Sequence, residues 1–190
     1  MSRRAAIVLG AVITVIGVVA IVLVIAGVTD SEDAGAASAE GPVEVAGLTY
    51  AIEGSRPLDE DGDRPAIGAL SPADRRLAGG QQLYGIFLAV DNRGSSPRPI
   101  ARRFTLVDGR GRRFAPLPLA ASSPFALPRG DVAPGHHSPR AASPPTADVA
   151  EDGYPLVFRV PGKVADDTEL TLRIEDPTGR GPAVDLLVQA

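Results

Sequence analysis

The stretch from Ala5 to Val28 constrains this chain most, because it holds 24 consecutive residues without a charged side chain. Isoleucine, valine, leucine, alanine and glycine make up almost all of it. At a helical rise of ~1.5 Å per residue the stretch would reach about 36 Å, and the hydrocarbon core of a bilayer is ~30 Å thick. The sequence therefore predicts one transmembrane helix over residues 5–28.

Charges on the two sides of the predicted span indicate its orientation. Arg3 and Arg4 lie in a short tail, residues 1–4, whereas the first charged residues after the span are acidic. Because basic flanks stay in the cytoplasm, we expect a cytoplasmic amino end and an extracytoplasmic carboxyl-terminal domain at the cell membrane. A signal peptide cleaved after Ala37-Ser38-Ala39 is the alternative, and it would release a secreted chain that begins at Glu40.

The chain beyond the span divides into a linker and one domain. Residues 29–42 are small, polar and acidic, so they predict a flexible linker. Residues 43–190 are long enough for one domain with one core. Within it, short runs of alternating apolar residues separated by turn residues predict six or seven strands and an all-β sandwich. Leu83–Val90 is apolar on both faces, so we expect a strand covered on both sides.

Three irregular features interrupt this pattern. Gly47 interrupts the first run of alternation, which predicts a bulge or bend in one strand. Ser55 to Gly80 has no sustained period and predicts a long loop, in which Ser71-Pro72-Ala73-Asp74 favours a single helical turn. Ala115 to Gly153 (115–153) contains eight prolines, which remove ladder donors, and it predicts a long, mostly irregular loop over the sandwich.

Leu83 to Phe114 resembles the central signature of the DUF4352-type, MPT63-like extracellular domains. That signature is a strand that ends in an Asn-x-Gly turn, followed by a Phe-x-Leu-x-Asp-x-x-Gly hairpin. The matching residues here are Asn92, Gly94, Phe104, Leu106, Asp108 and Gly111. Leu156–Pro161 is similar to the family's Val-Phe-x-Val-Pro strand. The resemblance covers roughly Val43 to Val188 and implies an immunoglobulin-like antiparallel β-sandwich outside the cell, without catalytic residues.

Charge and cysteine content exclude several classes of function. After the span the chain carries 17 basic and 23 acidic side chains, so it lacks the basic character that nucleic-acid binding requires. There are no cysteines. A disulfide framework, a thiolate metal site and a thiol nucleophile are therefore excluded.

Candidate metal ligands are few. Asp59, Asp61 and Asp63 alternate as in a calcium loop, but the segment lacks a distant glutamate and flanking helices, so a solvated acidic loop is favoured. His136 and His137 are the only histidines, and two adjacent side chains do not supply the three or four donors of a zinc or copper site. There is no Gly-x-Ser-x-Gly motif. We therefore expect no catalytic residue, no cofactor and no enzyme activity.

Two arginine clusters, Arg102-Arg103 and Arg110 to Arg113, flank the predicted hairpin. They predict either contact with an anionic phospholipid or wall polymer, or exposed strand edges that resist aggregation. The sequence as a whole favours a non-catalytic binding or accessory module at the bacterial cell envelope, with residues 115–153 as its contact surface. A structural subunit of a membrane protein complex is the alternative, and an envelope metal carrier or hydrolase is a third.

Overall fold

The computed structural model describes residues 40–138, 153–164 and 169–188. The predicted tail, the predicted span and nearly all of the predicted linker lie outside these ranges. Within them, no helix has the length and apolar character needed to cross a membrane. The span over residues 5–28 and its orientation therefore remain predictions from the sequence.

The described part of the chain is built from antiparallel strands arranged in two main sheets. The first sheet contains β1 (Val43–Val45), β2 (Leu48–Pro57), β3 (Gln81–Asn92), β8 (His136–Ser138) and β9 (Tyr154–Pro161). The second contains β11 (Val184–Val188), β10 (Leu170–Ile174), β5 (Phe104–Val107) and β6 (Arg113–Phe114), in that order. A small ladder joins β4 (Arg98–Pro99) to β7 (Asp131–Val132). The prediction of an all-β fold is confirmed.

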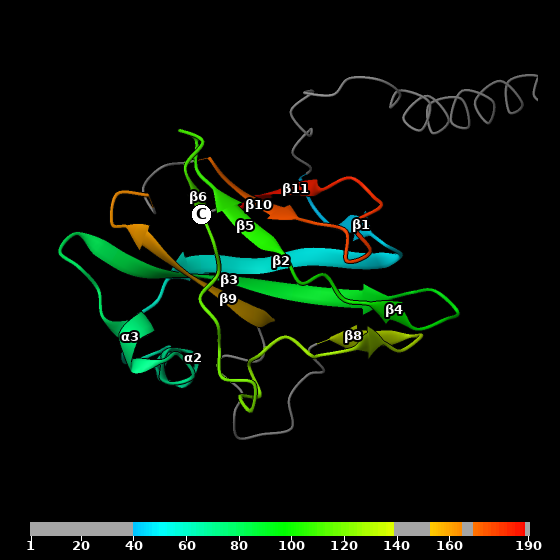
Figure 1. Cartoon of the computed structure of the whole chain (residues 1–190), viewed down its shortest axis with the longest axis horizontal. Coiled ribbons are helices and arrows are strands. Elements are labelled where there is room, and N and C mark those ends of the chain that lie inside the picture. Colours follow the sequence, from blue (N-terminus) through cyan, green and yellow to red (C-terminus); the bar gives the residue numbers. More distant parts are fainter. Residues whose placement is uncertain (1–39, 139–152, 165–168, 189–190) are drawn as a thin grey trace, which may run out of the picture. The chain divides into compact units, whose positions relative to one another are not determined.

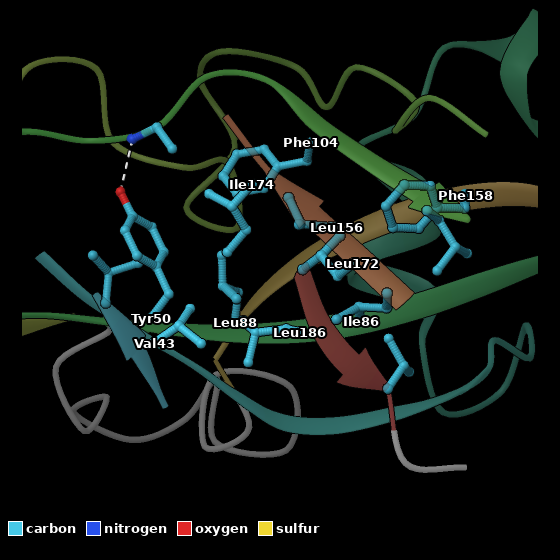
Figure 2. Close-up of a cluster of buried hydrophobic side chains, with 14 of the residues drawn as sticks. Val43, Tyr50, Ile86, Leu88, Phe104, Leu156, Phe158, Leu172, Ile174 and Leu186 are labelled. Carbon is cyan, nitrogen blue, oxygen red and sulfur yellow. Dashed lines mark hydrogen bonds between the residues drawn. The ribbon is translucent and has the colours of Figure 1, made fainter. Parts of the chain in front are cut away.

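The main core lies between the two sheets, because alternate residues of each strand point into the same layer. From the first sheet it receives Leu48, Tyr50, Tyr84, Ile86, Leu88, Val90, Leu156, Phe158 and Val160. From the second it receives Phe104, Leu106, Leu170, Leu172, Ile174, Leu186 and Val188. Figure 2 shows the side chains of Leu172, Ile174 and Leu186 meeting those of Ile86 and Leu88 across this layer. The chain is thus a β-sandwich.

The opposite face of β3 is also buried, but under irregular chain. Phe87 packs with Ala66 and Phe125, while Leu83 and Val157 pack with Leu70. These partners come from the connection that carries α2 (Arg64–Gly68) and α3 (Pro72–Arg75), and from the proline-rich segment. In Figure 1, α2 and α3 lie on the side of β3 opposite to β5 and β10. The expectation that β3 is covered on both sides is confirmed.

The prediction of one strand with a bulge or bend at Gly47 is wrong, because a tight turn separates β1 from β2. Ala46 and Gly47 have φ values of 53° and 79°, and Val45 pairs with Leu48. Two central residues with positive φ suit the right-handed twist of the strands they join. The irregularity in the ladder lies further along, between Ile52 and Gly54.

One further detail of the loops agrees with the sequence prediction, and one differs from it. The helical turn expected at Ser71 is confirmed, since the Ser71 Oγ accepts a hydrogen bond from the Asp74 N–H at 3.1 Å. The described part of the proline-rich segment, residues 115–138, is less irregular than predicted, because β7 and β8 lie within it. β8 pairs with the end of β3, Val90–Asn92, so this segment contributes to the first sheet.

Candidate functional site

A cleft of about 510 Å³ lies where the proline-rich segment meets the sandwich. Its lining comes from three stretches of chain: the residues before and at the start of β5, the first half of the proline-rich segment, and the start of β9. The lining residues are Ala101, Arg102, Phe104, Pro116, Leu117, Pro118, Leu119, Ala121, Ala126, Leu127, Pro128, Arg129, Pro155 and Leu156. The side chains are apolar except for the two arginines.

The proline-rich wall of the cleft is attached to the sandwich at several points. The Leu117 N–H donates to the carbonyl of Val157 on β9 at 2.7 Å, and the Ala120 N–H donates to the carbonyl of Ala69 at 2.8 Å. Phe125 is only 8% exposed. These contacts hold a segment that has little regular secondary structure of its own, so the cleft is preformed.

A buried tyrosine positions the opposite wall. The Tyr50 hydroxyl accepts a hydrogen bond from the Ala101 N–H at 2.8 Å, as Figure 2 shows. Burial raises the pKa of the Tyr50 phenol, and this effect outweighs the opposing influence of the Ala101 hydrogen bond. The phenol therefore remains neutral, and it fixes the backbone immediately before Arg102.

The β4–β7 ladder brings the two arginines of the cleft together. Arg98 pairs with Val132 and Pro99 pairs with Asp131. If this antiparallel register is continued, residues 101–102 lie opposite residues 128–129. Arg102 and Arg129 thus reach the same cleft although 26 residues separate them in the chain.

Arg102 and Arg129 have no acidic partner among the residues that the structure describes. Over the described residues, neither Arg102 nor Arg129 makes an ion pair or a side-chain hydrogen bond, and no aspartate or glutamate lines the cleft. The lining also offers no histidine, serine or carboxylate to transfer a proton or attack a substrate. An apolar pocket with a few charged groups at its margin has the composition of a binding site.

The segment with the three candidate acidic ligands, Asp59, Asp61 and Asp63, forms a structural turn. The Asp59 Oδ1 accepts hydrogen bonds from the N–H groups of Asp61 and Gly62 at 2.9 and 2.6 Å. Asp63 is buried, pairs with the Arg56 guanidinium at 2.8 Å and accepts from the Asp59 N–H. The carboxylates of Asp59 and Asp63 therefore stabilise the turn before α2. Across the described residues, no cluster of three or more potential ligands could hold a metal ion.

The two histidines lie in a strand, not in an irregular loop. They belong to β8, where His136 pairs with Asn92 and His137 pairs with Asp91 of β3. Adjacent residues of a strand point to opposite faces, so the two imidazoles diverge, although both residues border one open pocket at this end of the sheet. The His137 Nδ1 contacts the Asp91 carboxylate. The structure thus brings His137 to a carboxylate and separates it from His136.

The predicted arginine clusters divide between structural and unpaired groups. The Arg112 Nε lies 2.6 Å from Asp108, and the Arg103 guanidinium lies 3.4 Å from Glu175. Arg102 lines the cleft. Arg129 has no local sequence signal that marks it as part of this site, because two-residue strands leave no periodic pattern from which their pairing could be inferred.

Comparison with known proteins supports the fold and goes no further. No family model matches the chain, and no curated protein matches it. Among solved structures, the candidate lipoprotein YcdA from Bacillus subtilis is 16% identical with a TM-score of 0.50, over 80% of this chain and 39% of YcdA. An uncharacterised β-sandwich protein from Clostridium difficile is 9% identical with a TM-score of 0.44, over 84% of this chain and 100% of that protein.

The likeness to YcdA shows a shared fold, and this chain spans about two fifths of the YcdA chain. Since no family model matches, the resemblance to DUF4352-type domains remains a prediction from the sequence.

Proposed function

We propose that this chain is a membrane-anchored, extracytoplasmic immunoglobulin-like domain that acts as a non-catalytic binding or accessory module at the bacterial cell envelope. The observation that carries the proposal is the preformed cleft of about 510 Å³ beside the proline-rich segment. A rigid sandwich that holds a loop in place presents a defined surface, and binding sites concentrate on such loops.

The envelope location rests on the sequence of residues 5–28 and on the charges that flank them. YcdA is itself described as a candidate lipoprotein, which fits an envelope role for a domain of this fold. This chain has no cysteine to carry a lipid, so its attachment would depend on the apolar span.

The absence of cysteine gives a direct test of orientation. A cysteine introduced at Ser95→Cys, in the exposed turn after β3, should react with a membrane-impermeant maleimide on intact cells. Ser2→Cys, in the predicted cytoplasmic tail, should react only after lysis. Labelling of Ser2→Cys on intact cells, or protection of Ser95→Cys, would reverse the proposed orientation.

The binding face requires a test that leaves the fold intact. Deleting residues 115–153 would remove β7, β8 and the buried Phe125, so loss of function in that variant would be uninformative. We would instead place a photo-crosslinking amino acid at Ala121, which is exposed and lines the cleft, and at Ala78, which is exposed elsewhere. Specific adducts at Ala121 alone, on intact cells, are the expected result.

Adducts at both positions in equal yield, or at neither, would contradict a binding role for the cleft. If the Ala121 adduct were one protein in near-equal amount with the chain, the alternative of a structural subunit in a membrane complex would gain support.

A further inference from the structure

We propose that the cleft binds a single-chain lipid that carries an anionic head: the hydrocarbon lies against the leucine and proline wall, and Arg102 and Arg129 bind the head. This proposal rests on the proposed function and names the ligand class for the same cleft. The polarity of the walls, the placement of the two cations and the size of the cavity support it.

The walls are suited to hydrocarbon because they have few hydrogen-bonding groups to offer. The lining includes Pro116, Pro118, Pro128 and Pro155, which have no N–H group. Two of the remaining donors are occupied, since the N–H groups of lining residues 117 and 126 bond to carbonyls within the protein. A sugar or an extended peptide that lay against this wall would lose hydrogen bonds with water and would regain few of them from it.

The apolar side chains face the same space. Among the lining residues, Phe104 and Leu156 are buried, and Leu117, Leu119 and Leu127 are half-buried. Covering these half-exposed leucines with a hydrocarbon chain removes apolar surface from water, which favours binding at roughly 25 cal/mol per Å². The chemistry of the wall therefore favours an alkyl chain as occupant.

Charge complementarity identifies the head of the ligand. Six other arginines of the described residues have a carboxylate partner: Arg56, Arg93, Arg103, Arg112, Arg159 and Arg173. In the described structure Arg102 and Arg129 have none. Two unpaired guanidinium groups, beside a lining without an acid and in a chain of net charge −4, favour a carboxylate or phosphate ligand.

The dimensions of the cleft favour binding of a single lipid molecule and not contact with the surface of a membrane. A volume of about 510 Å³ lies within the range of ~300–1,000 Å³ that is typical of small-ligand pockets. A flat patch of arginines without a cavity would instead favour contact with many lipid headgroups at once. A hollow with cations at its margin accommodates one chain and one head.

The test uses the full-length chain in phosphatidylcholine nanodiscs and a diazirine derivative of dodecanoic acid as the probe. After irradiation, mass spectrometry locates the adducts. We expect adducts on residues 116–129 and 155–156, and at least tenfold fewer with the matching dodecanol derivative, because the alcohol lacks the charge. Adducts of equal yield with the alcohol, or adducts elsewhere on the domain, would overturn the proposal.

Variants separate the charge from the cavity. R102Q/R129Q should lower the yield of cleft adducts about tenfold, whereas the matched control R103Q, in which the neighbouring arginine outside the cleft is changed, should leave it within twofold. A121W fills the cleft from an exposed position and should lower the yield with both arginines present. Retention of adducts in R102Q/R129Q would overturn the assignment of the head.

Failure of the lipid assignment is distinguishable from failure of the proposed binding function. If the photo-crosslinker at Ala121 captures a ligand on cells but the dodecanoic acid probe leaves the cleft unlabelled, the binding role stands and the lipid assignment fails. If neither experiment labels the cleft, both fail.

Discussion

The two faces of β3 are buried in different ways, and the difference explains where a ligand can bind. On the inner face, Tyr84, Ile86, Leu88 and Val90 meet the strands of the second sheet. On the outer face, Leu83 and Phe87 meet residues of α2 and of the connection that follows it, together with the proline-rich segment. A regular sheet matches the spacing of its partner and closes the core, whereas an irregular cover leaves a cavity at its margin.

We call the chain over the outer face of β3 the outer cover: it comprises the connection that carries α2 and α3 and the first half of the proline-rich segment. The outer cover depends on a small number of attachments. Its proline-rich part is held by the N–H groups of Leu117 and Ala120 and by the buried ring of Phe125. The inner core, by contrast, draws on strands from both sheets. We therefore expect the cover to open at a lower free energy than the sandwich, in the way that binding loops generally do.

The largest effect is expected in the inner core, from Leu172→Ala. Leu172 is fully buried and pairs with Leu106 on one side and Leu186 on the other. Removing its side chain should lower the free energy of unfolding by about 3 kcal/mol, measured by urea denaturation. The matched control is Leu77→Ala, since Leu77 is 44% exposed and should change stability little. A small loss at Leu172 would contradict the sandwich core.

A smaller and more local effect is expected in the cover, from Phe125→Ala. Its ring packs in a cluster with Phe87 and Ala66, and the segment around it has little regular secondary structure and can collapse into the vacated space. We expect the free energy of unfolding to fall by about 2 kcal/mol, which is less than replacement of a large aromatic side chain in a core by alanine usually costs. The cleft should also change shape, so cleft labelling by the dodecanoic acid probe should fall. If Phe125→Ala lowered the free energy of unfolding more than Leu172→Ala does, the outer face would contribute more to stability than the inner face, which would contradict the comparison.

The sandwich also depends on one carboxylate, that of Asp108, at the turn between β5 and β6. Burial raises the pKa of Asp108, but hydrogen bonds from the Arg112 N–H and guanidinium and from the Arg110 N–H outweigh it, so the pKa lies below its ordinary value of 3.8. The stabilisation is therefore present above pH 3.8 and is lost as the pH falls through the lowered pKa.

Asp108→Asn tests this dependence. The substitution should lower the free energy of unfolding by about 2 kcal/mol at pH 7, because hydrogen bonds to a charged acceptor are replaced by weaker ones. The difference from the parent chain should shrink below pH 3.8 as Asp108 itself becomes protonated. Thermal unfolding over a pH series measures both effects, with Asp61→Asn in the exposed turn before α2 as the control. A difference that does not vary with pH would contradict the account.

The smallest effect is expected at the far edge of the cover, from Ser71→Ala. The Ser71 Oγ caps α3 by accepting the Asp74 N–H. Loss of this cap should lower the free energy of unfolding by about 1 kcal/mol. Ser95→Ala, in an exposed turn, is the control. A larger cost, measured by the same denaturation, would mean that α3 supports more of the cover than its short length implies.

The difference between the regular sandwich and the irregular outer cover also explains which parts of the fold could be predicted from the sequence. The strands of the sandwich have an alternating pattern, so β3, β5, β9, β10 and β11 were predictable, and the apolar second face of β3 predicted its cover. The turn at Ala46-Gly47 was missed, because alanine is not a residue that typically adopts positive φ. β7 and β8 were missed because strands of two or three residues show no period.

The candidate site was less predictable than the fold. Residues 115–153 were expected to form the contact surface, and the first half of that segment does line the cleft. The meeting of Arg102 with Arg129 depends on the long-range pairing of β4 with β7, which has no local sequence signal. The burial of Asp63 and its pairing with Arg56 likewise depend on tertiary packing, so a structural turn was indistinguishable from a solvated acidic loop.

The most direct test of the central claim, that the outer cover forms the binding face, is hydrogen–deuterium exchange of the full-length chain with and without dodecanoic acid. The amides of Leu117 and Ala120 should exchange faster than those of β10, because the cover opens locally while the sandwich stays folded. Dodecanoic acid should slow both amides, and dodecanol should not. Exchange of the cover at the rate of β10, unchanged by dodecanoic acid, would contradict the claim.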